Sequence, residues 1–190
     1  MIVYLFRHGR TQANAERRYL GETDQPLSNE GEAELKNARK YFCVRKVYIS
    51  PKIRCAKTAE ILFPNAHCAL VSDLREMNFG DFEMRTADEM KDDEAYLEWV
   101  NGMCEGRCPN GEDMAQFRRR TEQAFIEILN ENEGKEDVFI VAHGGTVKAV
   151  MSRFSLVQRS YWEWNAPFGG AVSAHAEKID GEWRLTPIEE

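Results

Sequence analysis

Histidine and arginine stand together near the start of the chain, in the run Arg7-His8-Gly9. The run follows the short apolar segment 2–6, which predicts a buried strand that ends in a polar loop. The guanidinium groups of Arg7 and Arg10 disfavour the protonated form of the imidazole beside them. A neutral imidazole is a nucleophile, whereas an imidazolium is not. A histidine taken alone is more often structural, so the hypothesis that His8 is a nucleophile depends on the rest of the chain.

Two further segments place basic groups after predicted strands. Arg54 lies one turn into a helix that is predicted to begin after Ser50-Pro51, from where it can turn back and bind an anion through two parallel N–H bonds. His143 ends the most apolar predicted strand, and Gly144-Gly145 then opens a helix whose first amides favour an anion. The ordinary alternatives are a solvated surface arginine and a buried structural histidine.

A carboxylic acid near such an anion site could protonate the leaving oxygen of a phosphate ester. Glu76, within the segment 74–80, is the candidate, and the acidic surroundings offer the alternatives Asp73, Asp81 and Glu83. The sequence contains no metal-ligand spacing, no P-loop and no Gly-x-Ser-x-Gly elbow. The residues therefore predict phosphoryl chemistry that uses basic and imidazole groups in place of a metal ion.

The elements that must position these groups alternate along the chain. We expect strands at 2–6, 46–50, 66–71 and 137–142, and helices at 29–42, 51–62, 113–132 and 146–154. The tail, residues 171–187, has two extended stretches around Asp180-Gly181, which predicts a hairpin. This order predicts an α/β fold with a mostly parallel central sheet, in which ligands bind beyond the carboxyl ends of the strands.

Composition limits the classes of protein and partner. The chain of 190 residues suits a single domain, and its net charge of −7 argues against nucleic acid and against anionic membrane surfaces as partners. Five cysteines, an odd number in a chain of this size, predict reduced thiols in a cytoplasmic protein. Cys104 and Cys108 form the one close pair, which is too little for a zinc site. No apolar run approaches the length of a membrane span.

Residues 84–110 are expected to form a lid-like insertion of loops and short helices over one end of the sheet. Tyr96, Trp99 and Met103 are spaced as a helical stripe, which either packs in the core or contacts the leaving group. A second aromatic set leaves the same two alternatives open: Trp162, Trp164 and Phe168.

The motifs together resemble those of the histidine phosphatase superfamily, the phosphoglycerate-mutase-like enzymes. The matching segments are 5–9 with Asn14, 21–31, 50–54 with 58–59, 74–80, 111–112 and 142–145. They occur in the family's order over nearly the whole chain, which is far more specific than any one motif. The resemblance implies a three-layer αβα sandwich and a single domain over residues 1–190, with no metal and no organic cofactor.

The resemblance also implies a role for each matching residue. His8 would attack phosphorus and become a phosphohistidine, and Glu76 would protonate the leaving group and then activate water. The residues implied to be catalytic are His8, Glu76, Arg7, Arg54 and His143. The residues implied to contact substrate are Arg7, His8, Asn14, Gly21, Arg54, Glu76, His143 and Gly144. Two departures stand out, since Arg10 replaces a usual Glu or Gln, and Glu83-Met84 replaces a common Glu-Gly.

Chain length and the pair Gly144-Gly145 favour hydrolysis over phosphoryl transfer, because mutases of this family are longer and typically have Gly-Asn there. The branch most resembled is α-ribazole-phosphate phosphatase. We therefore expect a metal-independent, acid-type phosphatase that acts on a small phosphorylated metabolite. A phosphoglycerate-mutase-type transferase and a non-catalytic phospho-ligand-binding protein remain alternatives, and a homodimer is left open.

Overall fold

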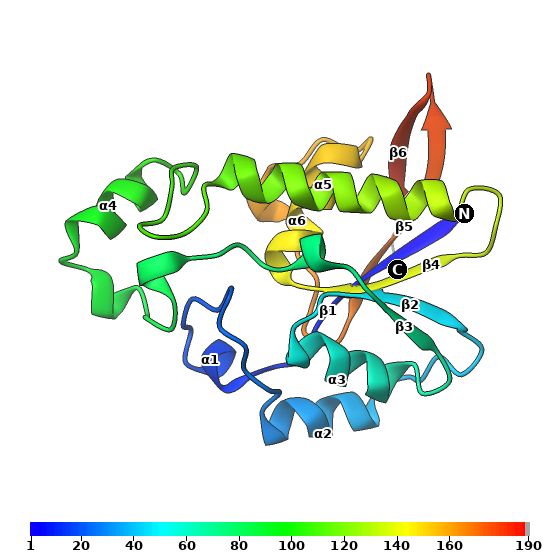
Figure 1. The fold of residues 1–190 in the computed structure, drawn as a ribbon, viewed down its shortest axis with the longest axis horizontal. Coiled ribbons are helices and arrows are strands. Elements are labelled where there is room, and N and C mark those ends of the chain that lie inside the picture. The colour runs from blue at the N-terminus through cyan, green and yellow to red at the C-terminus, as the bar shows by residue number, and fades with distance from the viewer. Residues whose placement is uncertain (189–190) are drawn as a thin grey trace.

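The computed structural model describes residues 1–188, and its centre is a twisted sheet (Figure 1). The strands are β1 (Ile2–Arg7), β2 (Lys46–Ile49), β3 (His67–Leu70), β4 (Val138–Ala142), β5 (Ala171–Ile179) and β6 (Glu182–Pro187). Within the described residues they form one six-stranded sheet in the order β3-β2-β4-β1-β5-β6. The pairs β2–β3, β2–β4 and β1–β4 are parallel, and β5 and β6 add an antiparallel hairpin beside β1. The predicted mostly parallel sheet and C-terminal hairpin are confirmed.

Helices cover both faces of this sheet. The helices are α1 (Gln12–Ala15), α2 (Asn29–Asn37), α3 (Ile53–Leu62), α4 (Glu94–Asn101), α5 (Met114–Glu131) and α6 (Gly144–Phe154). In Figure 1, α2 and α3 lie on one face of the sheet and α5 and α6 on the other. Each face buries its own apolar cluster, around Phe6 and Ile49 on the first side and around Leu5 and Phe125 on the second. This is the predicted three-layer αβα sandwich.

The helix predicted over residues 29–42 was too long. It ends at Asn37, where Ala38 turns to extended backbone and the Lys40 ammonium donates to the last helical carbonyls. Tyr41 leaves the helix to stack on Phe63, with 5.1 Å between ring centroids, and Phe42 is exposed. The spacing of apolar residues predicted that the helix would include Tyr41 and Phe42. Packing of the Tyr41 ring against Phe6 and Phe63 instead favours a chain that leaves the helix before residue 41.

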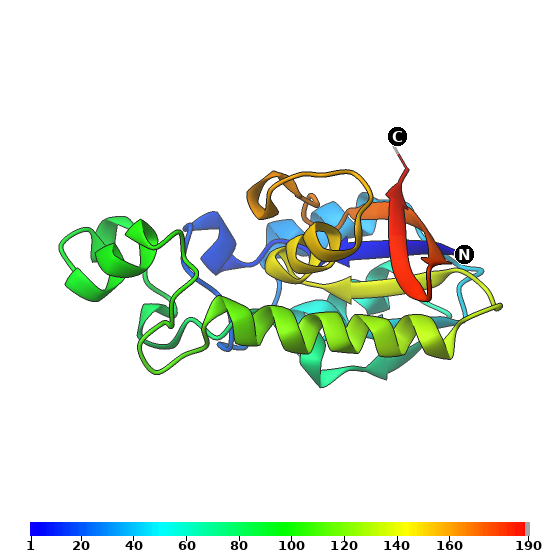
Figure 2. The same ribbon diagram turned by 90° about the horizontal axis from the view of Figure 1, so that it is seen from above.

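The segment between β3 and α5 projects from the sandwich beyond the carboxyl ends of the parallel strands (Figure 2). It consists of loops, α4 and three short 3₁₀ turns at Ser72–Leu74, Gly80–Phe82 and Asp88–Met90. Residues 84–110, the part named from the sequence, do consist of loops and short helices. A separate apolar cluster holds it together: Met77, Phe82, Met90, Tyr96, Trp99, Cys108, Met114 and Phe117. Tyr96 and Trp99 are therefore core residues of this segment, whereas Met103 is 65% exposed.

Across residues 1–188, no helix combines the length and the apolar character that crossing a bilayer requires.

Candidate active site

The parallel strands deliver two histidines to the same edge of the sheet. The amide of His8 donates to the Ala142 carbonyl over 3.0 Å, so the residue after β1 is tied to the end of β4. The imidazole of His143, which follows β4, lies with its centroid 5.2 Å from that of His8. His143 Nε2 is 2.8 Å from the hydroxyl of Ser50, which follows β2. Three strand ends that are far apart in sequence thus meet as predicted.

The hydrogen bonds of His8 define which ring nitrogen is free. Nδ1 lies 2.7 Å from the carbonyl oxygen of Gly9, which can only accept, so Nδ1 carries the proton. Nε2 of the neutral ring then keeps its lone pair. The Gly9 amide donates to the Thr58 hydroxyl, and that hydroxyl donates to the Arg54 carbonyl. The loop that orients His8 is therefore fixed to α3.

Burial keeps both imidazoles neutral. His8 is 4% exposed, and its burial, followed by the positive charge of Arg54 and that of Arg7, lowers its pKa to about 3. The hydrogen bond to the Gly9 carbonyl opposes this shift without cancelling it. Burial, Arg54 and His8 hold the pKa of His143 well below its ordinary value. At neutral pH His8 is therefore in its neutral, nucleophilic form.

The guanidinium groups around His8 are only partly satisfied by protein. Arg54 is fully buried and donates to the carbonyls of Thr23 and Gly21, each over 2.9 Å. Arg7 stacks on Phe168, with its guanidinium carbon 3.7 Å from the ring centroid. Among residues 1–188, three buried nitrogens of this cluster have no hydrogen-bond partner: Arg7 Nε, Arg54 Nε and His143 Nδ1. Unsatisfied buried donors are costly, and an anion with several oxygens would satisfy the two guanidinium nitrogens.

Glu76 lies at the rim of this cluster. Its Oε2 accepts from the Gly145 amide over 2.9 Å, and its Oε1 accepts from the Met77 amide over 3.1 Å. Gly145 is in the first turn of α6, where amides have no helical acceptor. A Cβ atom on Gly145 would lie 2.1 Å from Oε1, so glycine is required for this approach.

The other carboxylates of the segment are used differently. Glu83 accepts from the amides of Gly21, Glu22 and Thr23, and so holds the loop whose carbonyls hold Arg54. Asp81 is exposed and binds the Asn110 side chain. Of the candidates weighed from sequence, Glu76 is the one that lines the same cavity as Arg7.

Two of the predicted substrate contacts, Asn14 and Gly21, use their polar groups in hydrogen bonds within the protein. Asn14 Oδ1 accepts from the amide and hydroxyl of Thr11, and its side chain borders a shallow hollow together with Arg7 and Phe168. The amide of Gly21 donates to Glu83 and its carbonyl accepts from Arg54. The geometry therefore does not support Gly21 as a direct substrate contact; it positions Arg54.

A cavity of about 360 Å³ opens beside Glu76 and Arg7. Its walls carry six aromatic side chains: Tyr19, Phe79, Tyr96, Trp99, Tyr161 and Trp162. Tyr96 and Trp99 thus pack in the core and also line the cavity, and their contact with a leaving group stays a prediction. Of the second aromatic set, Trp162 lines the cavity, whereas Trp164 is buried in the main core and Phe168 packs on Arg7.

Lys148 and Tyr161 line the cavity and were missed by sequence reasoning. Burial, followed by the charge of Arg7, lowers the pKa of Lys148, while the Glu76 carboxyl acts in the opposite direction. Lys148 is one turn beyond Gly144 on α6, a spacing that places both residues on one helix face and could have signalled it. Tyr161 lies in a short 3₁₀ turn with no sequence signal of its own.

The two departures from the family pattern leave the cluster intact. Arg10 is half-exposed, lies 3.8 Å from Glu34, and stacks on the Phe168 ring that also carries Arg7. Met84 has a φ of 60°, the left-handed conformation that glycine adopts most readily. Met84 therefore adopts a backbone conformation that a glycine at this position would also adopt.

Within residues 1–188, no group of three or more His, Cys, Asp or Glu side chains is arranged to hold a metal ion.

Comparison with known proteins gives a consistent set of matches. The family model "Histidine phosphatase superfamily (branch 1)" matches residues 3–186. A protein of Escherichia fergusonii named "Probable phosphoglycerate mutase GpmB" is 35% identical over 157 residues, covering 79% of this chain and 73% of that protein. The crystal structure of the alpha-ribazole phosphatase from Shigella flexneri has a TM-score of 0.82 at 26% identity, covering 100% of this chain and 96% of that one. The crystal structure of a protein from Thermus thermophilus has a TM-score of 0.74 at 30% identity, covering 97% of this chain and 96% of that one.

Proposed function

The chain belongs to the histidine phosphatase superfamily, and we propose that it hydrolyses phosphomonoesters through a phosphohistidine formed on His8. The observation that carries the proposal is the surroundings of His8 Nε2. This nitrogen is unprotonated, and the same cluster contains three buried nitrogens without a hydrogen-bond partner, on Arg7, Arg54 and His143. Such a group of donors suits the oxygens of a phosphoryl group, and Glu76 stands at its rim.

In the first step, His8 Nε2 forms a bond to phosphorus while the bond from phosphorus to the ester oxygen breaks. The Glu76 carboxyl group gives its proton to the departing oxygen, so the leaving group is released as an alcohol. Arg7, Arg54 and His143 donate to the equatorial oxygens, where negative charge gathers in the transition state. The Gly144 amide, at the start of α6, and Asn14 are proposed as further phosphate contacts.

In the second step, the Glu76 carboxylate takes a proton from a water molecule that has replaced the alcohol. The hydroxide oxygen bonds to phosphorus and the bond to Nε2 breaks, which releases inorganic phosphate and restores neutral His8. Glu76 returns to its starting protonation state, so protons balance over the cycle. We propose that no metal ion takes part, because arginine and imidazole donors supply the charge stabilisation.

The cavity beside Glu76 suits a leaving group that contains a ring. Its aromatic walls offer flat apolar surface, and Lys148 adds a cation to the lining beside Arg7. We therefore propose a small phosphorylated metabolite with an aromatic part, and α-ribazole 5′-phosphate is the first candidate. The likeness to the Shigella flexneri alpha-ribazole phosphatase supports this choice. Residues 84–110 supply Tyr96 and Trp99, and we propose that they set substrate preference.

A phosphoglycerate-mutase-type transferase is the second candidate, favoured by the 35% identity to the protein named "Probable phosphoglycerate mutase GpmB". A panel of phosphomonoesters separates the two. Hydrolysis predicts release of inorganic phosphate, with a higher kcat/KM for α-ribazole 5′-phosphate than for 3-phosphoglycerate. Conversion of 3-phosphoglycerate to its 2-isomer without net phosphate release would favour the transferase instead.

A further inference from the structure

The segment that carries Glu76 needs external support for its main chain. Residues 75–78 lie between two 3₁₀ turns and belong to no helix or strand, so their carbonyl groups need partners from elsewhere. Arg120, on α5, supplies them. Its guanidinium donates to the carbonyl oxygens of Asp73 over 3.0 Å, Arg75 over 2.7 Å and Glu76 over 2.9 Å. Three contacts therefore tie the backbone around Glu76 to one side chain.

The same guanidinium is fixed from its other side by Glu112. Arg120 donates from Nε and from a terminal nitrogen to the two oxygens of this carboxylate, each over 2.7 Å. Burial acts to raise the pKa of Glu112, and the hydrogen bonds from Arg120 and the Asn78 amide outweigh it, so the pKa is lowered. Glu112 also accepts from the Asn78 amide and donates its own amide to the Asn78 carbonyl, both over 2.9 Å. Arg120 and Glu112 thus hold both ends of the segment 73–78.

From these contacts we infer that Arg120, clamped by Glu112, is a positioning residue for the catalytic acid. The inference rests on the role proposed for Glu76. The Glu76 carboxylate is held by two main-chain amides, of Met77 and Gly145, and faces the cavity. A shift of the backbone around Glu76 would therefore move its carboxylate relative to the Gly145 amide of α6, and displacement of a catalytic group by about 1 Å can cost about 100-fold in rate.

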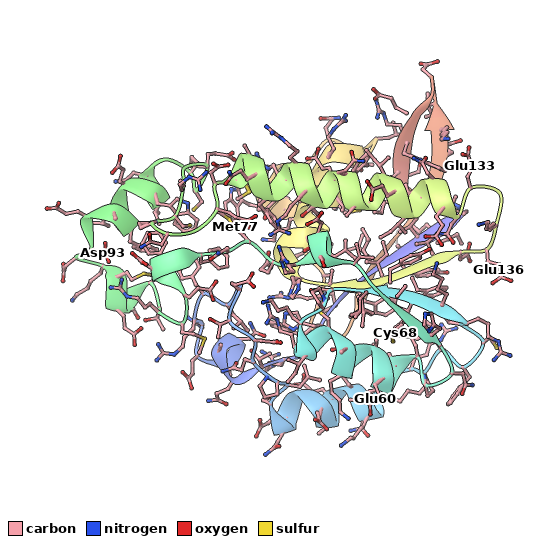
Figure 3. The ribbon with its side chains drawn as sticks, viewed as in Figure 1. Glu60, Cys68, Met77, Asp93, Glu133 and Glu136 are labelled. Atoms are coloured by element: carbon pink, nitrogen blue, oxygen red, sulfur yellow. The ribbon has the colours of Figure 1, made fainter. Side chains whose placement is uncertain are left out.

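The base of this clamp is rigid. Arg120 lies on the 18-residue helix α5, whose neighbours Phe117 and Thr121 are fully buried. Figure 3 shows Met77, the residue after Glu76, where the projecting segment meets the α/β body. A lysine at position 120 could keep the charge. Its single ammonium has three donors, too few for the carboxylate and the three carbonyls together.

Kinetics with two esters tests whether Arg120 acts through Glu76. An alkyl phosphate needs a proton on its leaving oxygen, whereas para-nitrophenyl phosphate has a leaving group that departs without one. We expect R120K to lower kcat/KM for the alkyl ester by about 100-fold and for the activated ester by less than about threefold. E76Q should show the same preference, and R120K should cause no further loss on the alkyl ester in the E76Q background. Equal losses on both esters, or losses that multiply in the double variant, would overturn the inference.

The matched control is R119K, the same substitution at the adjacent exposed arginine of α5, which should leave both kcat/KM values unchanged. Circular dichroism establishes that each variant is folded. Where R120K does not fold, E112Q takes its place, since it removes the charge that clamps the guanidinium and keeps the shape of the side chain. The same leaving-group dependence is expected of it.

A readout without turnover separates this inference from the proposed function. The Gly145 and Met77 amides donate to Glu76, so their hydrogen exchange, followed by NMR, reports the position of the carboxylate. R120K should accelerate exchange at both amides by about tenfold, the equivalent of one ordinary hydrogen bond, and R119K should not. Unchanged exchange in R120K would refute the clamp. A wild-type protein that hydrolyses no ester would refute the proposed function, and the exchange data would still decide the role of Arg120.

Discussion

Replacement of Gly145 by alanine tests the placement of Glu76 most sharply. The new Cβ would lie 2.1 Å from Glu76 Oε1, 3.0 Å from its carboxyl carbon and 3.2 Å from Oε2. An ordinary carbon–oxygen contact is about 3.3 Å, so the carboxyl group must withdraw by about 1 Å. That movement also breaks the 2.9 Å hydrogen bond from the Gly145 amide.

The expected kinetic effect follows from this displacement. A shift of about 1 Å in a catalytic group costs about 100-fold, and general acid catalysis contributes about 100- to 10,000-fold in all. Gly145→Ala should therefore lower kcat/KM for an alkyl phosphate by about 100-fold, or about 2.7 kcal/mol in the activation free energy. The loss for para-nitrophenyl phosphate should be much smaller, because its leaving group needs little proton assistance.

The free energy of unfolding should change little. Alanine gains about 1 kcal/mol over glycine inside a helix, and the lost bond to the carboxylate costs about 2 kcal/mol. A net loss of about 1 kcal/mol leaves the protein folded at 25 °C. Gly106→Ala is the matched control, because its Cβ would meet nothing closer than Trp99 at 3.9 Å. Wild-type kcat/KM for the alkyl phosphate in folded Gly145→Ala protein would refute the placement of Glu76.

Three further predictions follow from the same geometry. Because the pKa of His8 falls from 6.5 to about 3 on folding, the unfolded chain binds the proton first, and stability is lost as pH falls below 6.5. Between pH 7 and pH 5 the free energy of unfolding measured in urea should therefore fall by about 2 kcal/mol less in His8→Asn than in wild type. An equal fall in both proteins would contradict the buried neutral imidazole. Glu83→Gln weakens the hydrogen bonds that hold the loop 21–23, and should lower the free energy of unfolding by about 2 kcal/mol. It should also reduce kcat/KM, because the carbonyls of this loop hold Arg54 in place. An unchanged urea midpoint would argue against this role of Glu83. Phosphatase activity should survive dialysis against a chelator, and activity restored only by a divalent cation would contradict the metal-free mechanism.

The sequence predicted the sheet because each strand has a local signal, and it predicted the meeting of the strand ends because the parallel topology follows from the order of the elements. Segments 2–6 and 137–142 are apolar runs that end in polar motifs, and parallel strands bring such ends to one edge. His8 and His143 could therefore be placed together from the sequence alone.

The features that the sequence did not predict depend on contacts between distant segments. Tyr41 leaves its predicted helix because it stacks on Phe63 of another element. Arg120 binds main-chain carbonyls more than 40 residues away, which leave no trace in side-chain types. Its one signal was an arginine three residues after Phe117, on the apolar face of a helix, where a buried charge needs a partner.

Direct trapping of the intermediate tests the central claim. Enzyme mixed with a radiolabelled phosphomonoester and quenched in alkali within the first turnover should carry label on the peptide that contains His8. The adduct should be labile in acid, as a phosphoramidate is, and should be absent from His8→Asn, whose amide can keep the hydrogen bond to Gly9. Turnover of substrate with no covalent label, or label found on His143 or on a serine, would contradict the account.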